Sequence, residues 1–249
     1  MDSTRLSECL ATDFRALRAA VAAADPTAPV PSCPDWSVGD LAVHTATVYL
    51  HKTECIRLRR DPDPWPPELP DPDPLALLDG SYAGLVAEFA AHRPGDPART
   101  WYGPDQTVGF WIRRMAQETV IHRIDAELAA GLPLSPVPDD LAVDGIDELL
   151  DVFLGYGTVT WAAEYAELLA GADGRPLVVR TTDRAWTART TEEGIRIAAG
   201  AAPDAAAEIS GDPVPLLLRL WNRADSGVSA QGDPELLARF QALTVASTQ

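Results

Sequence analysis

Glu118 and His122 are the residues in this sequence whose spacing most directly suggests chemistry. They stand four positions apart in segment 108–130, which is predicted to be a helix, so they share one helical face. A second predicted helix, 37–60, carries His44. If the two faces meet, two imidazoles and one carboxylate could bind a divalent metal ion. A fourth tetrahedral position would stay open, as in catalytic zinc sites.

Other interpretations of this donor set stay open at this point. The residue order is not the HExxH pattern of zinc proteases, and Glu118 is better placed as a ligand than as a base. The same donors would suit ferrous iron or nickel. A glutamate and a histidine four apart on a helix can also be an ordinary polar pair without any metal.

Three further polar residues lie near these positions on the two predicted helices. Asp125 could accept the outer N–H of the His122 imidazole and fix its orientation, or it could pair with a neighbouring arginine. His51 lies about two turns after His44 and could line a pocket or be a partly exposed helix residue. Cys55 could be a nucleophile, although a buried and unreactive thiol is the simpler interpretation.

Two features of segment 108–130 follow from spacing alone. Trp111 stands one or two turns before Glu118 and could form a wall of a pocket. Arg123 and Glu127 are four apart, which predicts an ion pair on the surface of the helix that contributes about a few tenths of a kcal/mol.

Capping residues and prolines mark the helices of the first half. Ser37 and Asp40 form a capping-box pattern, and Trp36 and Leu41 stand where the residues of a hydrophobic staple are found. Seven prolines within 61–74 exclude a helix interior or a central strand and predict an extended loop. The predicted helices cover residues 5–24, 37–60, 75–92 and 108–130, which together suit a four-helix bundle.

The pattern changes in the second half. A fifth helix is predicted over 140–170. Short segments with strand character follow at residues 177–180, 185–188, 195–197 and 207–209. Asp212 and Asp233 each precede a proline at a first helical position, where an aspartate can cap the helix. The predicted fold class is α+β, with a helical bundle over residues 1–135 and a smaller α+β domain over residues 140–249.

The composition excludes two classes of partner. The formal net charge of −17 repels phosphate backbones and anionic membranes, so binding to nucleic acid or membranes is not expected. No stretch is long and apolar enough to span a membrane, and the N-terminus lacks a signal-peptide pattern, so a cytoplasmic protein is predicted. The three cysteines are expected to be reduced thiols. The bias towards Ala, Arg and Pro is typical of a high-GC bacterial genome.

Two motifs resemble those of a known family. Residues 33–44 read CPDWSVGDLAVH and residues 113–127 read RRMAQETVIHRIDAE. Both are similar to the metal-ligand segments of the mycothiol-dependent maleylpyruvate isomerase family, which belongs to the DinB-like metal-binding bundles. The segments ISGD, LWNR and GDPELL, which begin at residues 209, 220 and 232, resemble the sterol-carrier-like domain of such proteins.

This resemblance implies a set of ligands and a cosubstrate. His44, Glu118 and His122 match the three ligands of a zinc ion, although other divalent metals would also fit, and mycothiol is the low-molecular-weight thiol that the family uses. Arg223 matches an arginine in a tryptophan–glycine–arginine segment of the family, which implies a catalytic role. The sequence departs from the family here, because Asn222 stands in the place of the glycine.

The predicted function is that of an enzyme from an actinobacterium that activates mycothiol as a thiolate. The thiolate would add to a small electrophilic substrate, which is expected to bear a carboxylate. As an isomerase it would add the thiol to a cis double bond, allow rotation and release the thiol, whereas as an S-transferase it would release the adduct. Two alternatives remain: a non-enzymatic protein that binds a metal or an apolar ligand, and a metal-dependent hydrolase that places water in the open position. The sequence does not predict an oligomeric state.

Overall fold

The structure is a computed structural model that describes residues 1–68 and 73–248. The chain divides into two compact units, Met1–Pro136 and Val137–Gln249. The first is a helical bundle and the second contains a sheet with helices, which confirms the predicted α+β class. Among the described residues no helix is long and apolar enough to cross a membrane.

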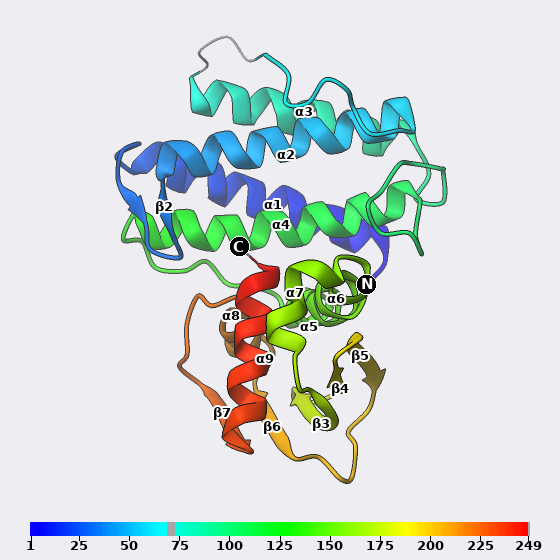
Figure 1. The fold of residues 1–249 in the computed structure, drawn as a ribbon. Helices are drawn as coiled ribbons and strands as arrows, with labels where there is room; N and C mark the ends of the chain where they lie inside the picture. Colours follow the sequence, from blue (N-terminus) through cyan, green and yellow to red (C-terminus); the bar gives the residue numbers. More distant parts are fainter. Residues whose placement is uncertain (69–72, 249) are drawn as a thin grey trace. The chain divides into compact units, whose positions relative to one another are not determined.

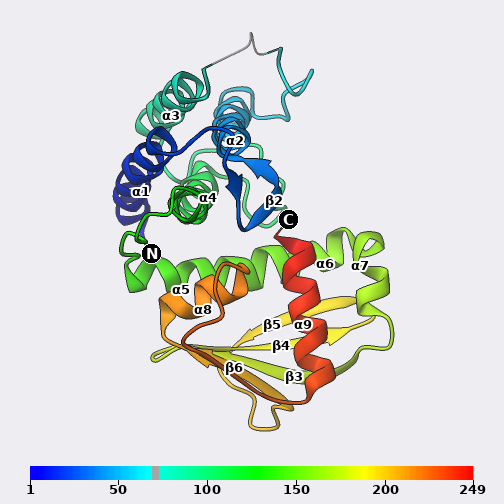
Figure 2. The ribbon, with the colours of Figure 1, turned by 90° about the vertical axis from the view of Figure 1, so that its left-hand side faces the viewer.

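The described residues of the first unit form four long helices, which can be followed in Figures 1 and 2. They are α1 (Ser3–Ala23), α2 (Val38–Leu58), α3 (Pro74–Ala91) and α4 (Val108–Ala129). All four predicted helices are present, and their ends differ from the predicted ones by at most two residues. Helix α1 packs against α4, and α2 packs against both α3 and α4. The core between them is built from fully buried side chains such as Leu10, Leu17, Leu41, Leu85 and Met115.

The start of α2 matters for function because it sets the position of His44. Both halves of the predicted capping box are present: Asp40 N–H donates to Ser37 Oγ, and Ser37 N–H donates to Asp40 Oδ2 at 2.9 Å. A short hairpin leads into this cap, formed by β1 (Pro29–Val30) and β2 (Cys33–Ser37). The sequence did not predict these strands.

The proline-rich loop connects α2 to α3. Its described residues 61–68 form neither helix nor strand, as predicted from the prolines. Residues 69–72 of the predicted loop lie outside the described residues.

The predicted single helix over 140–170 is wrong. The segment forms α5 (Asp139–Glu148), the π-helical segment η1 (Leu149–Tyr156), α6 (Gly157–Thr160) and α7 (Ala162–Leu169). Gly155 and Gly157 weaken a regular α-helix here because glycine has no side chain and high conformational freedom. The ring of Trp161 occupies the space next to Gly157, where a Cβ would lie 3.4 Å from it, and the helix breaks at that tryptophan.

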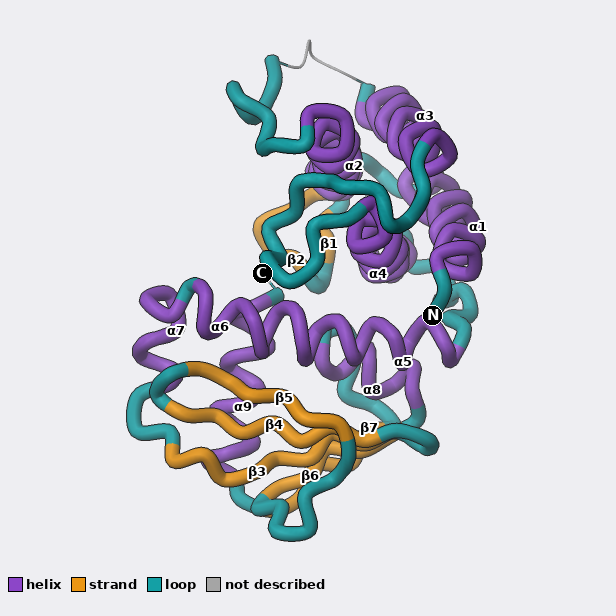
Figure 3. The backbone as a smooth tube through the Cα atoms, turned by 90° about the vertical axis from the view of Figure 1, so that its right-hand side faces the viewer, coloured by secondary structure: helices purple, strands orange, loops and turns teal. Residues whose placement is uncertain are grey.

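Among its described residues, the second unit has a sheet of five strands, which is seen in Figure 3. They are β3 (Asp173–Arg180), β4 (Ala185–Thr191), β5 (Gly194–Ala199), β6 (Ala207–Gly211) and β7 (Val228–Gly232), in the order β5-β4-β3-β6-β7. All neighbours are antiparallel except β3 and β6, which are parallel. Four strands were predicted. The fifth, β7, was missed because its sequence, VSAQG, has little of the β-branched and aromatic character typical of strands.

Helices α8 (Pro213–Leu220) and α9 (Pro234–Ser247) pack against this sheet. The predicted cap of α9 is confirmed, because Asp233 Oδ1 accepts from the N–H groups of Glu235 and Leu236 at 3.0 Å. The predicted side-chain cap of α8 is wrong, since Asp212 makes no such bond. The third residue of α8 is Pro215, which has no N–H to donate to an N-cap side chain.

Candidate metal centre

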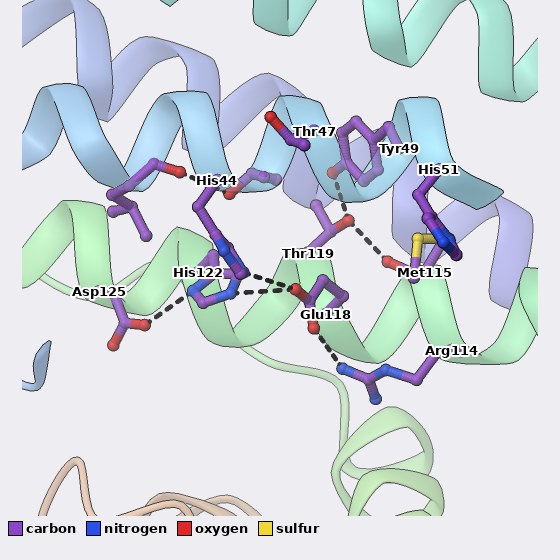
Figure 4. A network of polar contacts seen from close by, with 12 residues as sticks. His44, Thr47, Tyr49, His51, Arg114, Met115, Glu118, Thr119, His122 and Asp125 are labelled. Carbon is purple, nitrogen blue, oxygen red and sulfur yellow. Dashed lines mark hydrogen bonds and ion pairs between the residues drawn. The ribbon is translucent and has the colours of Figure 1, made fainter. Parts of the chain in front are cut away.

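His44, Glu118 and His122 converge between two antiparallel helices. Helices α2 and α4 run in opposite directions, so that His44 faces the turn of α4 that carries the other two residues (Figure 4). Glu118 Oε1 lies 3.3 Å from His44 Nε2 and 3.1 Å from His122 Nε2. One donor atom from each residue lies within 4.8 Å of the others. The structure thus brings together the three predicted ligands.

This arrangement fits a zinc ion. In a tetrahedral zinc site, each donor atom lies about 2.0–2.1 Å from the metal, which puts two donor atoms about 3.3 Å apart. The distances from Glu118 Oε1 to the two imidazole Nε2 atoms, 3.3 Å and 3.1 Å, are close to this value. The side chain of His44 is 37% exposed, whereas those of Glu118 and His122 are 15% and 10% exposed. A ligand would therefore reach the site from the side of His44.

Arg114 holds the second oxygen of Glu118. Its Nη2 donates to Glu118 Oε2 at 2.6 Å, and its side chain is almost fully buried. Because Oε2 is held by the guanidinium, Oε1 is the oxygen that faces the two histidines. This role of Arg114 was not predicted, although its spacing of four residues before Glu118 is the same signal that links Glu118 to His122.

Asp125 orients the imidazole of His122. Asp125 Oδ2 lies 3.0 Å from His122 Nδ1, and Ser32 Oγ donates to Asp125 Oδ1. The carboxylate of Asp125 is fully buried. With Nδ1 bonded to this carboxylate, His122 turns Nε2 towards Glu118, which is the geometry expected of an outer partner of a metal ligand.

Opposite charges outweigh burial at this site. Burial alone would raise the pKa of Glu118, but the charge of His122, hydrogen bonds from both histidines and the charge of Arg114 hold that pKa well below its ordinary range. Burial alone would lower the pKa of His122, but the charge of Glu118 and the bond to Asp125 raise it to about 9. A cation entering the site would therefore compete with a proton on His122.

Comparisons with known proteins identify the family of this chain. The family model described as the mycothiol maleylpyruvate isomerase N-terminal domain matches residues 7–127, and the model described as the MDMPI C-terminal domain matches residues 140–239. The chain belongs to the mycothiol-dependent maleylpyruvate isomerase family. Together the two models cover most of both units, so the resemblance seen in the sequence is confirmed.

Two solved structures share the fold of this family member. A mycothiol-dependent maleylpyruvate isomerase carrying a histidine-to-alanine mutation is 13% identical, with a TM-score of 0.61. A second structure, of a mycothiol-dependent maleylpyruvate isomerase, is 14% identical, with a TM-score of 0.59. Each comparison covers 94% of this chain and 96% of the other. No curated protein sequence gave a significant match.

Trp36 covers the histidines in this member of the family. Its ring centroid lies 4.5 Å from that of His44 and 6.1 Å from that of His122. From the sequence, Trp36 was predicted only to be part of the hydrophobic staple at a helix start. Its position at the end of β2, directly before the α2 cap, places it over the site, and only the unpredicted hairpin could have revealed this.

His51 and Cys55 do not join the three candidate ligands. His51 Nδ1 lies 3.4 Å from Cys55 Sγ, and the His51 ring contacts the ring of Trp65 with centroids 4.8 Å apart. Burial raises the pKa of the Cys55 thiol to about 11, so the thiol is protonated near neutral pH. The interpretation of Cys55 as a buried, unreactive thiol is the one that the structure favours.

The predicted surface pair of Arg123 and Glu127 is wrong, because both side chains are buried. Arg123 is fully buried; its Nη1 donates to Glu127 Oε2 at 2.8 Å and its Nε donates to Asp13 Oδ1 at 3.1 Å. Nη1 also donates to the carbonyl of Ser135 at 2.8 Å. Helix α4 is buried on nearly all sides, so a face that looked polar in sequence is covered by α1 and by the segment after α4.

Arg223 lies in the second unit. Its Nη1 donates to the carbonyl of Trp221, and its guanidinium lies 6.0 Å from the centroid of the Trp221 ring. Asn222 has a φ of +59°, a left-handed conformation that glycine adopts freely and that asparagine tolerates better than most residues. The replacement of the family glycine is therefore compatible with this backbone, and a catalytic role for Arg223 stays a prediction.

Proposed function

We propose that this protein is a zinc-dependent enzyme that activates mycothiol, a low-molecular-weight thiol, for addition to a small electrophilic substrate, as a cis–trans isomerase or as an S-transferase. The observation that supports this proposal is the convergence of His44, Glu118 and His122 on one point, with distances that fit zinc and an exposed side at His44. Membership of the maleylpyruvate isomerase family supports the same chemistry.

The residues of the site have distinct tasks in this proposal. When bound, zinc would supply the positive charge that keeps a thiol deprotonated near neutral pH. His44, His122 and Glu118 would provide three ligands. Asp125 keeps the His122 ring turned towards the site, and Arg114 keeps the Glu118 carboxylate in place.

The chemistry of the isomerase balances without any redox partner. The thiolate sulfur forms a bond to one carbon of a conjugated cis double bond, and the electron pair of that double bond moves onto the conjugated carbonyl oxygen. The remaining carbon–carbon single bond rotates. Return of the electron pair restores the double bond in the trans form and expels the thiolate. In the S-transferase, the adduct instead takes up a proton and leaves with the sulfur attached.

The experiment that tests the proposal is metal analysis of the purified protein followed by titration with mycothiol. The wild-type protein should bind about one zinc per chain and then the thiol, whereas Glu118→Ala and His44→Ala should lose metal, thiol binding and turnover together. His92→Ala provides a matched control, because His92 lies at the end of α3, where its Nδ1 lies 2.9 Å from the Glu88 carbonyl, and it should keep all three properties.

Three results would contradict the proposal. Turnover without any added thiol would instead indicate a hydrolase. Uptake of metal without turnover for any thiol would indicate a binding protein. Failure of the wild-type protein to bind any divalent metal would remove the basis of the proposed chemistry.

A further inference from the structure

Lys52 is the only lysine in the chain, and it lies in the same helix interface as the candidate metal ligands. It follows His44 by eight residues in α2, a distance of roughly 12 Å along the helix axis at 1.5 Å per residue. Its Nζ lies 4.9 Å from the centroid of the Trp111 ring in α4. Lys52 therefore stands between α2 and α4, about two helical turns from the site.

The ammonium of Lys52 has a neutral partner. Its Nζ lies 3.2 Å from His51 Nδ1. Burial, followed by the charge of Lys52, lowers the pKa of His51 to about 4, so His51 is a neutral acceptor. Over the described parts of the chain, no carboxylate lies within salt-bridge distance of Lys52.

Two neighbouring cations, Arg99 and Arg114, each form an ion pair with a carboxylate. The guanidinium of Arg114 is bound to Glu118, and that of Arg99 is bound to Asp61 at 2.9 Å. Neither of these two carboxylates forms an ion pair with Lys52, although the charges of both act on its ammonium from a longer distance. Of the three cations Lys52, Arg99 and Arg114, Lys52 is therefore the one that has no carboxylate in direct contact among the described residues.

A half-buried ammonium without an anionic partner is costly. The face of Trp111 offsets part of this cost, but it satisfies no N–H donor, and an ammonium has three. Burial lowers the pKa of Lys52, although the charge of Glu118 opposes this shift from a distance, and a negative charge in direct contact would oppose it more strongly. A carboxylate is the ligand that supplies both the missing acceptor and the missing charge.

We propose that Lys52 binds a carboxylate of the ligand that occupies the metal site, so that the protein selects ligands with a carboxylate about two helical turns from the sulfur. This inference rests on the proposed thiol chemistry, because the sulfur defines the other end of the ligand. Trp111 forms the surface beneath the ammonium, and Lys52 determines specificity.

The test uses thiols that carry a carboxylate at different distances. Mercaptopropionate, mercaptohexanoate and mercaptooctanoate are each compared with the mercapto alcohol of the same length, by calorimetric titration of the zinc-loaded protein. In the wild type, the longer acids should bind about tenfold to a hundredfold more tightly than their alcohols, as expected for a charge-assisted hydrogen bond. The shortest acid cannot reach Lys52 and should show no such preference.

Three variants connect this preference to Lys52. Lys52→Met should remove the difference between acid and alcohol while leaving the affinity for the alcohols unchanged, which also shows that the variant is folded. Lys52→Arg keeps a cation and should retain a preference. Arg15→Met removes one positive charge from the exposed surface of α1, where Arg15 contacts Thr12, and should behave as the wild type.

A second titration identifies the source of the carboxylate. Glutarate is added to zinc-loaded protein that already holds mercaptoethanol. Glutarate binding that is lost in Lys52→Met assigns the carboxylate to the electrophile, whereas a preference confined to the mercapto acids assigns it to the thiol.

Equal affinities of acids and alcohols at every length in the wild type would overturn the inference, as would a preference that survives in Lys52→Met. Failure of all thiols, alcohols included, to bind would instead refute the proposed thiol chemistry. In that case, glutarate binding to the zinc-loaded wild type and to Lys52→Met decides the role of Lys52 alone.

Discussion

Metal uptake by this site should depend on pH through a single proton on His122. Although burial opposes it, the charge of Glu118 and the bond to Asp125 raise the pKa of His122 to about 9 in the metal-free protein. At pH 7 the imidazole thus carries a proton on both nitrogens, and Nε2 must lose its proton before it can bind a metal. At about 1.36 kcal/mol per pH unit, removing that proton at pH 7 costs about 2.7 kcal/mol.

The apparent metal affinity should therefore rise about tenfold per pH unit between about pH 7 and pH 9, and then level off. Competition with a chelator, corrected for the protonation of the chelator itself, measures this slope. Calorimetry in two buffers with different ionisation enthalpies measures the proton directly, and we expect about one proton released per metal at pH 7.

Asp125→Asn is the informative variant, because it removes the negative charge beside His122 Nδ1. The plateau in affinity should begin at a lower pH in this variant. An affinity that does not change between pH 7 and pH 9, with no proton released, would refute the charge assignment at His122.

Three further predictions concern stability and the neighbours of the ligands. In the folded protein the pKa of His122 lies above its ordinary value of 6.5. The contribution of this histidine to stability is therefore complete below about pH 6.5 and is lost as the pH rises through about 9. The melting temperature of the metal-free protein should fall across this range, and that of the zinc-loaded protein should change less. Arg114→Met should weaken zinc binding about tenfold to a hundredfold in chelator competition, as loss of an outer partner does elsewhere; an unchanged affinity would show that Glu118 needs no support. Arg123→Met should lower the free energy of unfolding by about 3–5 kcal/mol in urea denaturation, because Asp13 and Glu127 stay buried without their cation, while zinc affinity per folded molecule should be unchanged.

The helices of the first unit were predictable because their ends carry local signals. The cap at Ser37 and the prolines after α2 act within a few residues, so the sequence contains the whole signal. The candidate ligands were predictable for a related reason. Glu118 and His122 are neighbours on one helix by spacing alone, and the motif around His44 supplied the second helix.

The features that were missed depend on contacts between distant segments. Arg123 looked like a surface residue because its sequence neighbours are mixed, and only the packing of α1 and Ser135 against it makes it buried. Trp36 lies over the histidines because of a hairpin whose pairing joins residues 29–30 to residues 33–37. The sequence assigns no role to Lys52, the one lysine of the chain, because the contacts of its ammonium depend on how α2 and α4 pack.

The contacts of Ser135 have a practical consequence for dissecting this protein. Ser135 N–H donates to Glu127 Oε2 at 3.0 Å, and its carbonyl accepts from Arg123, so a residue beyond the end of α4 contributes hydrogen bonds to two buried charged groups in the last two turns of that helix. A gene fragment that stops at the last residue of α4 would leave those groups short of partners and open to solvent. Expression of the bundle alone should therefore extend past Ser135, and a shorter fragment would be expected to aggregate or to be degraded by proteases.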